Sequence, residues 1–293
     1  MSVEHAAALI RAGKLVAFPT EPVYGLGANA FDPAAVVRIF TAKGRPHTSP
    51  LIVHVDSIEM ARGLAACWPA AAETLARRYW PGPLTLVVSK RAEIPDIVTA
   101  DLLTVGLRMP AHPLALELIR AAGVPIAGPS ANRFTELSPT TAGHVPESLA
   151  DYVLDGGPAR VGIESTVLSL VNAPLLLRPG VIPLPEIEAL IGPVETAMAP
   201  ASGAHASPGM TPRHYRPATR LYLLDAGEHP PEGRGTLLRI GHEMPADARE
   251  YAAVLYDMLH RLDAQRLDWI AVERPPETPQ WAGVLDRLRR AAS

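Results

Sequence analysis

The sequence contains a single cysteine, Cys67, among its 293 residues. One thiol can form neither an intramolecular disulfide nor a cysteine cluster for a metal, which is typical of proteins from a reducing compartment. Because Cys67 lies between Ala66 and Trp68, we expect it to be a small core residue. The histidines form no H-E-x-x-H or similar dense pattern, and no G-x-S-x-G elbow occurs. The sequence therefore offers no metal-ligand set and no candidate for nucleophilic catalysis.

The chain also lacks an excess of charge of one sign, with 27 Lys and Arg against 30 Asp and Glu. Proteins that coat nucleic acids or anionic membranes draw on a strongly basic face, so neither is expected to be its main role. A local basic pocket remains compatible with this balance. No apolar run approaches the roughly 20 residues of a membrane span, and the N-terminus does not read as a signal peptide. These absences predict a soluble cytoplasmic protein with no membrane contact.

What the sequence does contain is enough length for two domains. Residues 1–193 alternate between short β-rich runs and segments of helical composition, which predicts an α/β or α+β domain. Residues 194–218 are rich in small and turn-forming residues and predict a linker or loop. Residues 219–293 return to the alternating pattern and predict a small second α/β domain.

The string Gly25-Leu-Gly-Ala-Asn-Ala30 matches a loose dinucleotide fingerprint. That fingerprint must open a helix directly after a strand, whereas the helix start here is delayed to Asp32-Pro33. We therefore interpret Gly25 and Gly27 as permitting a tight turn near a ligand rather than as a nicotinamide site.

Polar residues beside proline or glycine recur at the ends of the predicted strands, where α/β proteins bind ligands. Lys43 and Arg45 together could bind an anion such as a polyphosphate, although Lys43 alone fits a solvated cationic turn equally well. His54 alone is more typical of a satisfied core histidine. Taken together, the set predicts a pocket, and it comprises Thr20, Lys43, Arg45, Ser49, His54, Arg108, Ser130, Asn132, Ser165 and Arg178.

These segments, in this order, resemble the YrdC-type threonylcarbamoyl-AMP synthases in their long, two-domain form. The resemblance is carried by FPTEPVYGLGANA at 18–30, AKGRPHTSPLIVHV at 42–55, PGPLTLVV at 81–88, VGLRMPAHP at 105–113, GPSAN at 128–132, SPTTA at 138–142, DGGP and GIESTV within 155–167, and LLRPG at 176–180. SPGMTPRHYRP at 207–217 resembles the hinge of the long form, and RLRRAA at 287–292 resembles its C-terminal end.

The resemblance implies a large YrdC-like twisted-sheet α/β domain followed by a small Rossmann-like α/β domain. It also implies synthesis of L-threonylcarbamoyladenylate from L-threonine, bicarbonate or CO2, and ATP, with Mg²⁺ carried by the ATP phosphates and pyrophosphate released. The product would pass to a transferase complex that modifies adenosine 37 of tRNA to t6A. Direct contact with tRNA is a further expectation.

Carried over position by position, the resemblance assigns roles to fourteen residues. Lys43 and Arg45 would be the catalytic cations, and both Lys43 and Arg108 are expected on the pocket rim. The nucleotide contacts would be Lys43, Arg45, Ser49, Thr104, Asn132, Thr140, Arg178, His214 and Tyr215. The threonine and carbamate contacts would be Thr20, His54, Arg108, Ser130 and Ser165, with Arg108 as partner of the threonine carboxylate. His214 and Tyr215 would reach back from the linker as a lid.

Two departures from the family pattern affect this transfer. Pro22 stands where the family commonly has Thr, and Phe134-Thr135 stands where Ser-Gly often follows the Ser-Ala-Asn string. An RNA-binding protein that uses the same basic concave face is the alternative function. A carbamoyl-transfer domain of hydrogenase maturation would require a zinc-finger segment, which one cysteine excludes.

Overall fold

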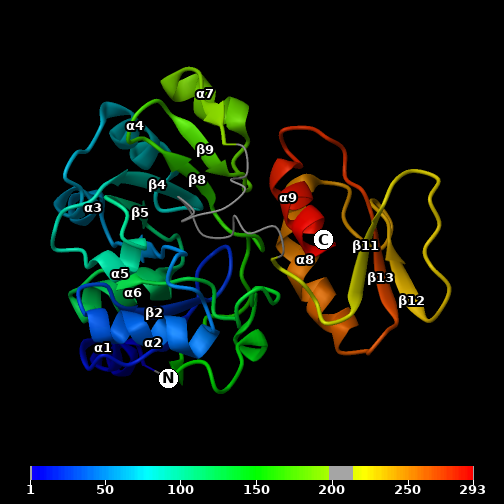
Figure 1. The fold of residues 1–293 in the computed structure, drawn as a ribbon, viewed down its shortest axis with the longest axis horizontal. Helices are drawn as coiled ribbons and strands as arrows, with labels where there is room; N and C mark the ends of the chain where they lie inside the picture. The colour runs from blue at the N-terminus through cyan, green and yellow to red at the C-terminus, as the bar shows by residue number, and fades with distance from the viewer. Residues whose placement is uncertain (1, 198–213, 293) are drawn as a thin grey trace.

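The structure is a computed structural model that describes residues 2–197 and 214–292. Figure 1 shows a larger part built on a ten-stranded mixed sheet and a smaller part built on a three-stranded parallel sheet. The predicted fold class, a large twisted-sheet α/β domain with a small Rossmann-like one, is confirmed.

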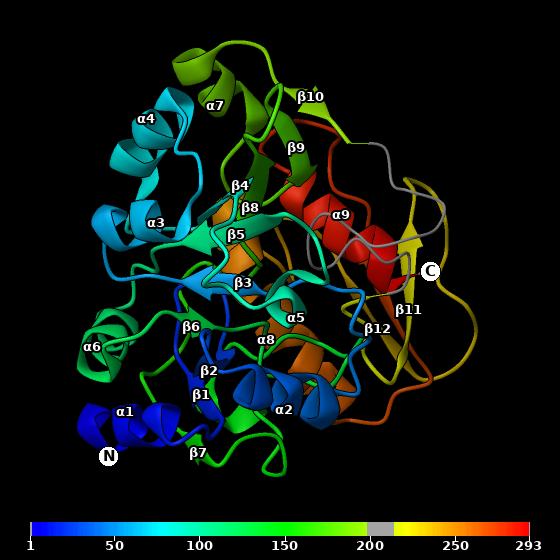
Figure 2. The same ribbon diagram turned by 60° about the vertical axis from the view of Figure 1, so that its left-hand side comes forward.

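The large sheet has the strand order β10-β9-β8-β4-β5-β3-β6-β2-β1-β7. Its strands are β1 (Val16–Phe18), β2 (Gly25–Asn29), β3 (Ile52–His54), β4 (Leu84–Ser89), β5 (Thr104–Arg108), β6 (Ile126–Ala127), β7 (Tyr152–Val153), β8 (Thr166–Ser169), β9 (Leu175–Arg178) and β10 (Glu195–Thr196). Its helices are α1 (Val3–Arg11), α2 (Pro33–Lys43), α3 (Ile58–Leu64), α4 (Ala70–Tyr79), α5 (Asp96–Thr99), α6 (Pro113–Ala122), the 3-10 turn η1 (Ala142–His144) and α7 (Leu184–Ile191). Helices α2, α3, α4, α5 and α7 pack on one face of this sheet, with Ala17, Val53 and Leu107. Helices α1 and α6, neighbours at the lower left of Figure 2, pack on the opposite face, with Val16, Phe18 and Ile126.

The helix ends follow the chain's local signals. The Asp32 side chain accepts from two backbone amides of α2, Pro33 occupies the first turn, and Gly44 ends the helix at φ 63°. Gly123 ends α6 in the same left-handed conformation, at φ 70°. The predicted helix start at Asp32-Pro33 is confirmed, and Gly44 sets the end of α2 directly after Lys43.

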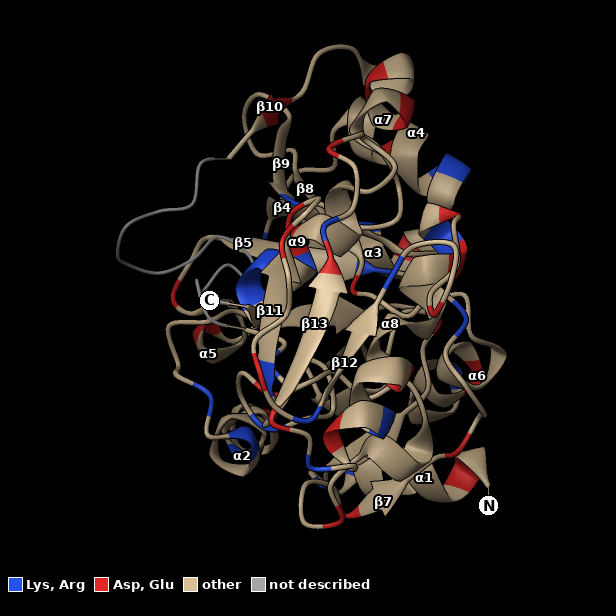
Figure 3. Cartoon of the chain, turned by 90° about the vertical axis from the view of Figure 1, so that its right-hand side faces the viewer, with Lys and Arg blue, Asp and Glu red and all other residues tan. Residues whose placement is uncertain are grey.

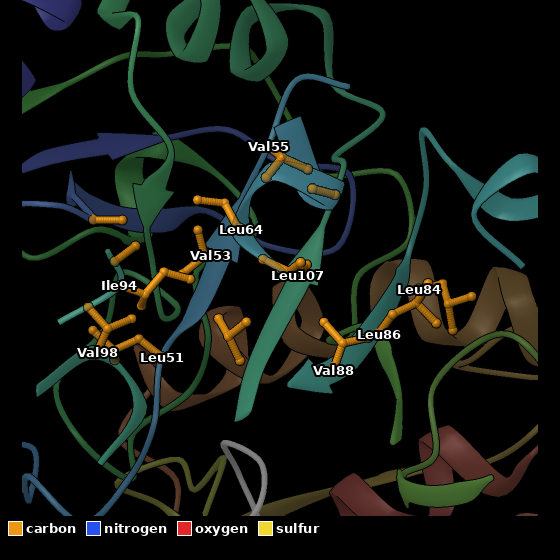
Figure 4. Packing of buried hydrophobic residues seen from close by; sticks show 14 of the residues in the cluster. Leu51, Val53, Val55, Leu64, Leu84, Leu86, Val88, Ile94, Val98 and Leu107 are labelled. Atoms are coloured by element: carbon orange, nitrogen blue, oxygen red, sulfur yellow. The ribbon is translucent and has the colours of Figure 1, made fainter. Parts of the chain in front are cut away.

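Side chains of the central strands alternate between a hydrophobic core and the pocket described below. Figure 4 shows Val53 of β3, Leu86 of β4 and Leu107 of β5 packing together on the helix-covered side. Their neighbours in sequence point to the opposite face, because successive residues of a strand alternate. β3 and β5 are parallel with His54 opposite Arg108, so the strand register places these two side chains together.

The interpretation of Gly25 and Gly27 as a tight turn is wrong. Both lie in β2, which pairs antiparallel with β1 and β6. A Cβ on Gly27 would come within 2.8 Å of Ile126 Cγ2, and one on Gly25 within 3.0 Å of the Phe18 ring. The glycines therefore make room for core side chains across the strand rather than reversing the chain.

The prediction of a buried Cys67 is also wrong, because Cys67 is exposed. It lies between α3 and α4, where the neighbouring Trp68 donates its indole N–H to Glu73. The apolar neighbours of Cys67 in sequence therefore do not indicate burial.

The small domain consists of β11 (Arg220–Leu224), β12 (Gly235–Leu238), α8 (Ala248–Asp263), β13 (Trp269–Glu273) and α9 (Ala282–Ala291). Its strands are parallel, in the order β11-β13-β12. Figure 1 shows α8 and α9 between this sheet and the large domain. Among the described residues, no helix is long and apolar enough to cross a membrane.

Candidate active site

One pocket gathers nine of the fourteen predicted site residues at the strand ends of the large domain. They are Thr20, Arg45, His54, Arg108, Ser130, Ser165, Arg178, His214 and Tyr215. Pro22 and Glu164 also line it. Residues from well-separated parts of the sequence thus converge on one site, as the sequence predicts.

Two buried arginines form one end of the pocket. Arg45 donates to Ser49 Oγ at 2.5 Å and to the Pro50 carbonyl oxygen at 3.0 Å. Arg178 donates to the carbonyl oxygen of Ser165 at 3.0 Å and to its hydroxyl at 3.2 Å. Burial, with a contribution from the Arg178 charge, lowers the pKa of Arg45 to about 10, so Arg45 stays charged at neutral pH. This end of the pocket is therefore cationic.

Lys43 lies at the end of α2 and is buried, so its expected position on the pocket rim is wrong. Its Nζ donates to the carbonyl oxygens of Ser130 (2.6 Å) and Asn132. Burial and the nearby Arg45 charge lower the pKa of the ammonium group. Lys43 thus fixes the 130–132 loop beside the pocket.

Arg108, at the other end of the pocket, is buried as well and is paired with a protein carboxylate. Its Nη2 lies 2.7 Å from Glu21 Oε2, and the same oxygen accepts from the Ala111 amide at 2.9 Å. Arg108 Nε donates to the Gly82 carbonyl oxygen at 3.2 Å. Sequence reasoning missed Glu21, although it directly follows Thr20 in the FPTE string. Its carboxylate orients the guanidinium and offsets its charge.

His54 lies beside Arg108 and is both a core residue and a pocket residue. Its Nδ1 is 3.3 Å from the Ile126 carbonyl oxygen, and its ring meets Phe18 edge-on at 5.5 Å. Burial and the Arg108 charge lower the pKa of His54 to about 3. The imidazole is therefore neutral at neutral pH.

Two side-chain hydroxyl groups, those of Thr20 and Ser165, also line the pocket. Thr20 Oγ1 donates to the Val23 carbonyl oxygen at 2.5 Å, next to Pro22. Ser165 Oγ lies 2.8 Å from Thr85 Oγ1. Polar oxygen atoms are thus present even though Pro22 supplies none from its side chain.

His214 and Tyr215 lie within the predicted linker and line the pocket. Tyr215 is only 1% exposed and adopts a left-handed backbone with φ 61°. The His214 ring meets Phe134 edge-on at 5.6 Å, and the Arg45 guanidinium lies 5.8 Å from the centre of the same Phe134 ring. Phe134, a departure from the family pattern, therefore packs against two residues that line the pocket. Residues 198–213 of the predicted linker lie outside the described residues.

The other predicted nucleotide contacts do not line this pocket. Thr104 lines a separate cavity with Thr85 and Val167, and Thr140 Oγ1 lies 3.3 Å from His144 Nδ1. Asn132 donates to the carbonyl oxygens of Arg133 and Glu136 and lines another cavity. Ser49 accepts hydrogen bonds from Arg45, and Lys43 donates hydrogen bonds to the 130–132 loop.

The pocket's chemistry is that of anion binding rather than metal coordination. Within residues 2–197 and 214–292, no group of three or more His, Cys, Asp or Glu side chains could hold a metal ion. The Glu164 carboxylate is engaged by Ser138 Oγ, the Tyr256 hydroxyl and Arg287. The fold and the pocket together define a two-domain α/β protein with a buried cationic site at its strand ends.

Comparisons with known proteins identify the family. The Sua5/YciO/YrdC family model, described as "Telomere recombination", matches residues 8–180, and the model described as "Threonylcarbamoyl-AMP synthase, C-terminal domain" matches residues 182–293. The chain therefore belongs to the threonylcarbamoyl-AMP synthase family, whose members are adenylyl-transferring enzymes.

The relatives match over nearly their whole length. The threonylcarbamoyl-AMP synthase of Pyrococcus abyssi is 42% identical, across 98% of this chain and 93% of the relative. That of Bacillus subtilis is 41% identical, across 99% and 92%. The crystal structure of P. abyssi Sua5 complexed with L-threonine superposes with a TM-score of 0.92, at 40% identity, over 99% of this chain and 94% of that one. The resemblance drawn from the sequence motifs is confirmed.

Proposed function

We infer that this chain synthesises L-threonylcarbamoyl-AMP from L-threonine, bicarbonate or CO2, and ATP. The observation that carries this inference is one buried pocket with Arg45 and Arg178 at one end and Arg108 at the other. Guanidinium groups recognise phosphates and carboxylates through paired hydrogen bonds. The first end suits the ATP phosphates, with Lys43 behind it, and the second suits the threonine carboxylate.

The chemistry needs no protein nucleophile. The threonine amine adds to CO2 with loss of a proton, or condenses with bicarbonate with loss of water, to give a carbamate. A carbamate oxygen then attacks the α-phosphorus of ATP. The bond from that phosphorus to the bridging oxygen breaks, and pyrophosphate leaves. The protein must position the reactants and stabilise the charge that develops on phosphate, which Arg45, Arg178 and Lys43 are suited to do.

The product is a mixed anhydride that water would hydrolyse. His214 and Tyr215 cover the pocket from the small-domain side, and both are buried. A closed cover excludes water and protects such a product. The pair therefore supports a lid role in the proposed reaction.

Magnesium fits this site as part of the MgATP substrate. The pocket's Glu164 carboxylate already has three donors, so the phosphates would carry the ion. Under this proposal, the enzyme acts in the cytoplasm, and its product passes to a transferase complex for t6A formation on tRNA. A direct tRNA contact remains a prediction.

An RNA-binding protein is the less supported alternative. The relatives are synthases by name. Acidic and basic segments alternate along the small domain in Figure 3, and the whole chain carries a formal net charge of −3. A protein that chiefly binds RNA would need a continuous basic face.

Pyrophosphate release from ATP, Mg²⁺ and bicarbonate, measured with and without L-threonine, tests the function. We expect release to require L-threonine and to match the formation of threonylcarbamoyl-AMP. L-Serine, which lacks the methyl group, is the matched control substrate. Release that is indifferent to threonine would refute the proposed function.

A further inference from the structure

Arg287, on α9 of the small domain, is completely buried against the large domain. Its Nε donates to Glu164 Oε2 at 2.7 Å, and its Nη2 donates to the Glu164 carbonyl oxygen at 3.2 Å. Its Nη1 donates to the Pro179 carbonyl oxygen at 2.9 Å. Glu164 precedes Ser165, and Pro179 follows Arg178. One guanidinium from the small domain therefore binds both segments that bring these two residues to the pocket.

The same guanidinium lies against the cover of the pocket. The Arg287 guanidinium carbon is 5.1 Å from the centre of the Tyr215 ring, within range of a cation–π contact. The Tyr215 ring also stacks on Tyr256 of α8 at 6.0 Å. A left-handed backbone at a non-glycine residue costs on the order of 1–3 kcal/mol and persists only where its surroundings hold it. Arg287 and Tyr256 are the surroundings that hold Tyr215.

The backbone fit between α9 and the loop after Arg178 is equally close. A Cβ on Gly283 of α9 would lie 2.5 Å from the Gly180 carbonyl oxygen, so no side chain fits there. A shift of α9 would therefore displace the loop that carries Arg178. The helix and the nucleotide end of the pocket form one packed unit.

The charges around Arg287 do not by themselves account for its burial. Glu164 and Asp286 both lie 2.7 Å from its guanidinium nitrogens. Buried ion pairs contribute little net stability compared with well-packed apolar residues, although breaking one by removing a single partner is costly. A role in positioning gives this buried pair a function beyond stability.

We propose that Arg287 is a positioning residue for the adenylyl transfer. Its bonds to Glu164 and Pro179 fix the guanidinium in place, and the guanidinium holds Tyr215 over the pocket. This rests on the proposed function, and it gives the small domain a defined role, because α9 then closes the nucleotide end of the pocket.

Arg287→Lys tests this role, because lysine keeps the charge but loses the planar fork that reaches both carbonyl groups and the Tyr215 ring. The quantity measured is threonylcarbamoyl-AMP formed per pyrophosphate released. We expect this ratio to fall by about tenfold, as contacting residues that act together are commonly coupled at that level. Arg289→Met removes an exposed charge from the same helix and is the matched control, with an unchanged ratio expected.

A double-mutant cycle with Tyr215→Leu separates positioning from general structural support. If Arg287 acts through Tyr215, then Tyr215→Leu with Arg287→Lys should lower the ratio no further than Tyr215→Leu alone. Additive effects, or a lower melting temperature with an unchanged ratio, would overturn the proposal. If Arg287→Lys does not fold, the double variant Arg287→Met with Glu164→Gln takes its place, because it removes both charges of the buried pair. The same results would support or overturn the proposal. Loss of threonine-dependent release in the unaltered protein would instead refute the proposed function itself.

Discussion

At the end of the pocket that we propose binds the nucleotide, Arg45 bonds to Ser49 and to backbone carbonyl oxygens. Lys43, behind this end, bonds to backbone carbonyl oxygens. Within residues 2–197 and 214–292, no carboxylate forms an ion pair with either of them. At the amino-acid end, Arg108 is paired with the Glu21 carboxylate at 2.7 Å. Both ends are buried and both rely on arginine, yet Arg108 forms an ion pair with a carboxylate, whereas Arg45 bonds to a hydroxyl group and to carbonyl oxygens.

This difference matches the two anions that the ends are proposed to bind. A polyphosphate carries several negative charges, so its site benefits from cations that keep their net charge. An amino-acid carboxylate carries one charge, and a guanidinium beside Glu21 can bind it without drawing polyphosphate to the wrong end. Glu21 therefore contributes to specificity through Arg108.

Removal of Arg45 should give the largest effect and sharpens the nucleotide side of the comparison. Arg45→Met keeps the length of the side chain and removes its charge. Because stabilisation of developing phosphate charge is lost, we expect kcat/KM for ATP to fall by about 10²–10³-fold. The KM for threonine should change little. A comparable rise in both KM values would indicate that Arg45 shapes the whole pocket.

Lys43→Met should reduce both activity and stability, unlike a change at a pocket rim. The variant leaves the Ser130 and Asn132 carbonyl oxygens without their buried donor, which costs about 1–3 kcal/mol of unfolding free energy. Urea unfolding measures this cost. Unchanged stability with lost activity would mean that Lys43 acts only on the ligand.

Glu21→Gln tests the amino-acid side. Glutamine can still accept from the Ala111 amide but no longer offsets the Arg108 charge. We expect the Arg108 guanidinium then to attract polyphosphate as well, so that saturating ATP competes with threonine and raises the apparent KM for threonine about tenfold, with the KM for ATP unchanged. Glu136→Gln, a change at an exposed carboxylate, is the control. Equal effects on both substrates would break the comparison.

The pH dependence of stability should give the smallest effect, and it concerns His54. Its folded-state pKa of about 3 lies below the unfolded value near 6.5, so the unfolded chain binds more protons between these two values. The unfolding free energy should therefore rise with pH in this window, by up to about 1.4 kcal/mol per pH unit for one such group. Urea unfolding at pH 5 and at pH 7 gives the change in unfolding free energy between these pH values. This change should be smaller for His54→Gln than for the unaltered protein. His242→Gln, at an exposed position, is the control.

Much of this site could be predicted from the sequence because its signals are local. Asp32 caps the start of α2 and Gly44 ends it. The polar residues at strand ends meet because parallel strands end together. Other features depend on contacts between distant residues, which local patterns do not reveal. The Glu21–Arg108 pair and the burial of Lys43 against the 130–132 loop are of this kind.

The glycines of β2 show the opposite difficulty. The spacing of Gly25 and Gly27 in the sequence favours a turn. Glycine is needed at these positions because the side chains of Phe18 and Ile126, from neighbouring strands, leave no room for a Cβ atom. Arg287 is similar, since RLRRAA reads as a basic helix end and gives no sign that one arginine is fully buried. Tertiary packing decides these cases.

The division of the pocket is tested most directly by titrating ATP and L-threonine, each separately, into three proteins. These are the unaltered protein, Arg45→Met and Arg108→Met. We predict a crossed pattern, in which Arg45→Met weakens ATP binding alone and Arg108→Met weakens threonine binding alone, each by tenfold or more, about 1.4 kcal/mol. If both variants weakened both ligands to the same extent, the two ends would not be distinct sites.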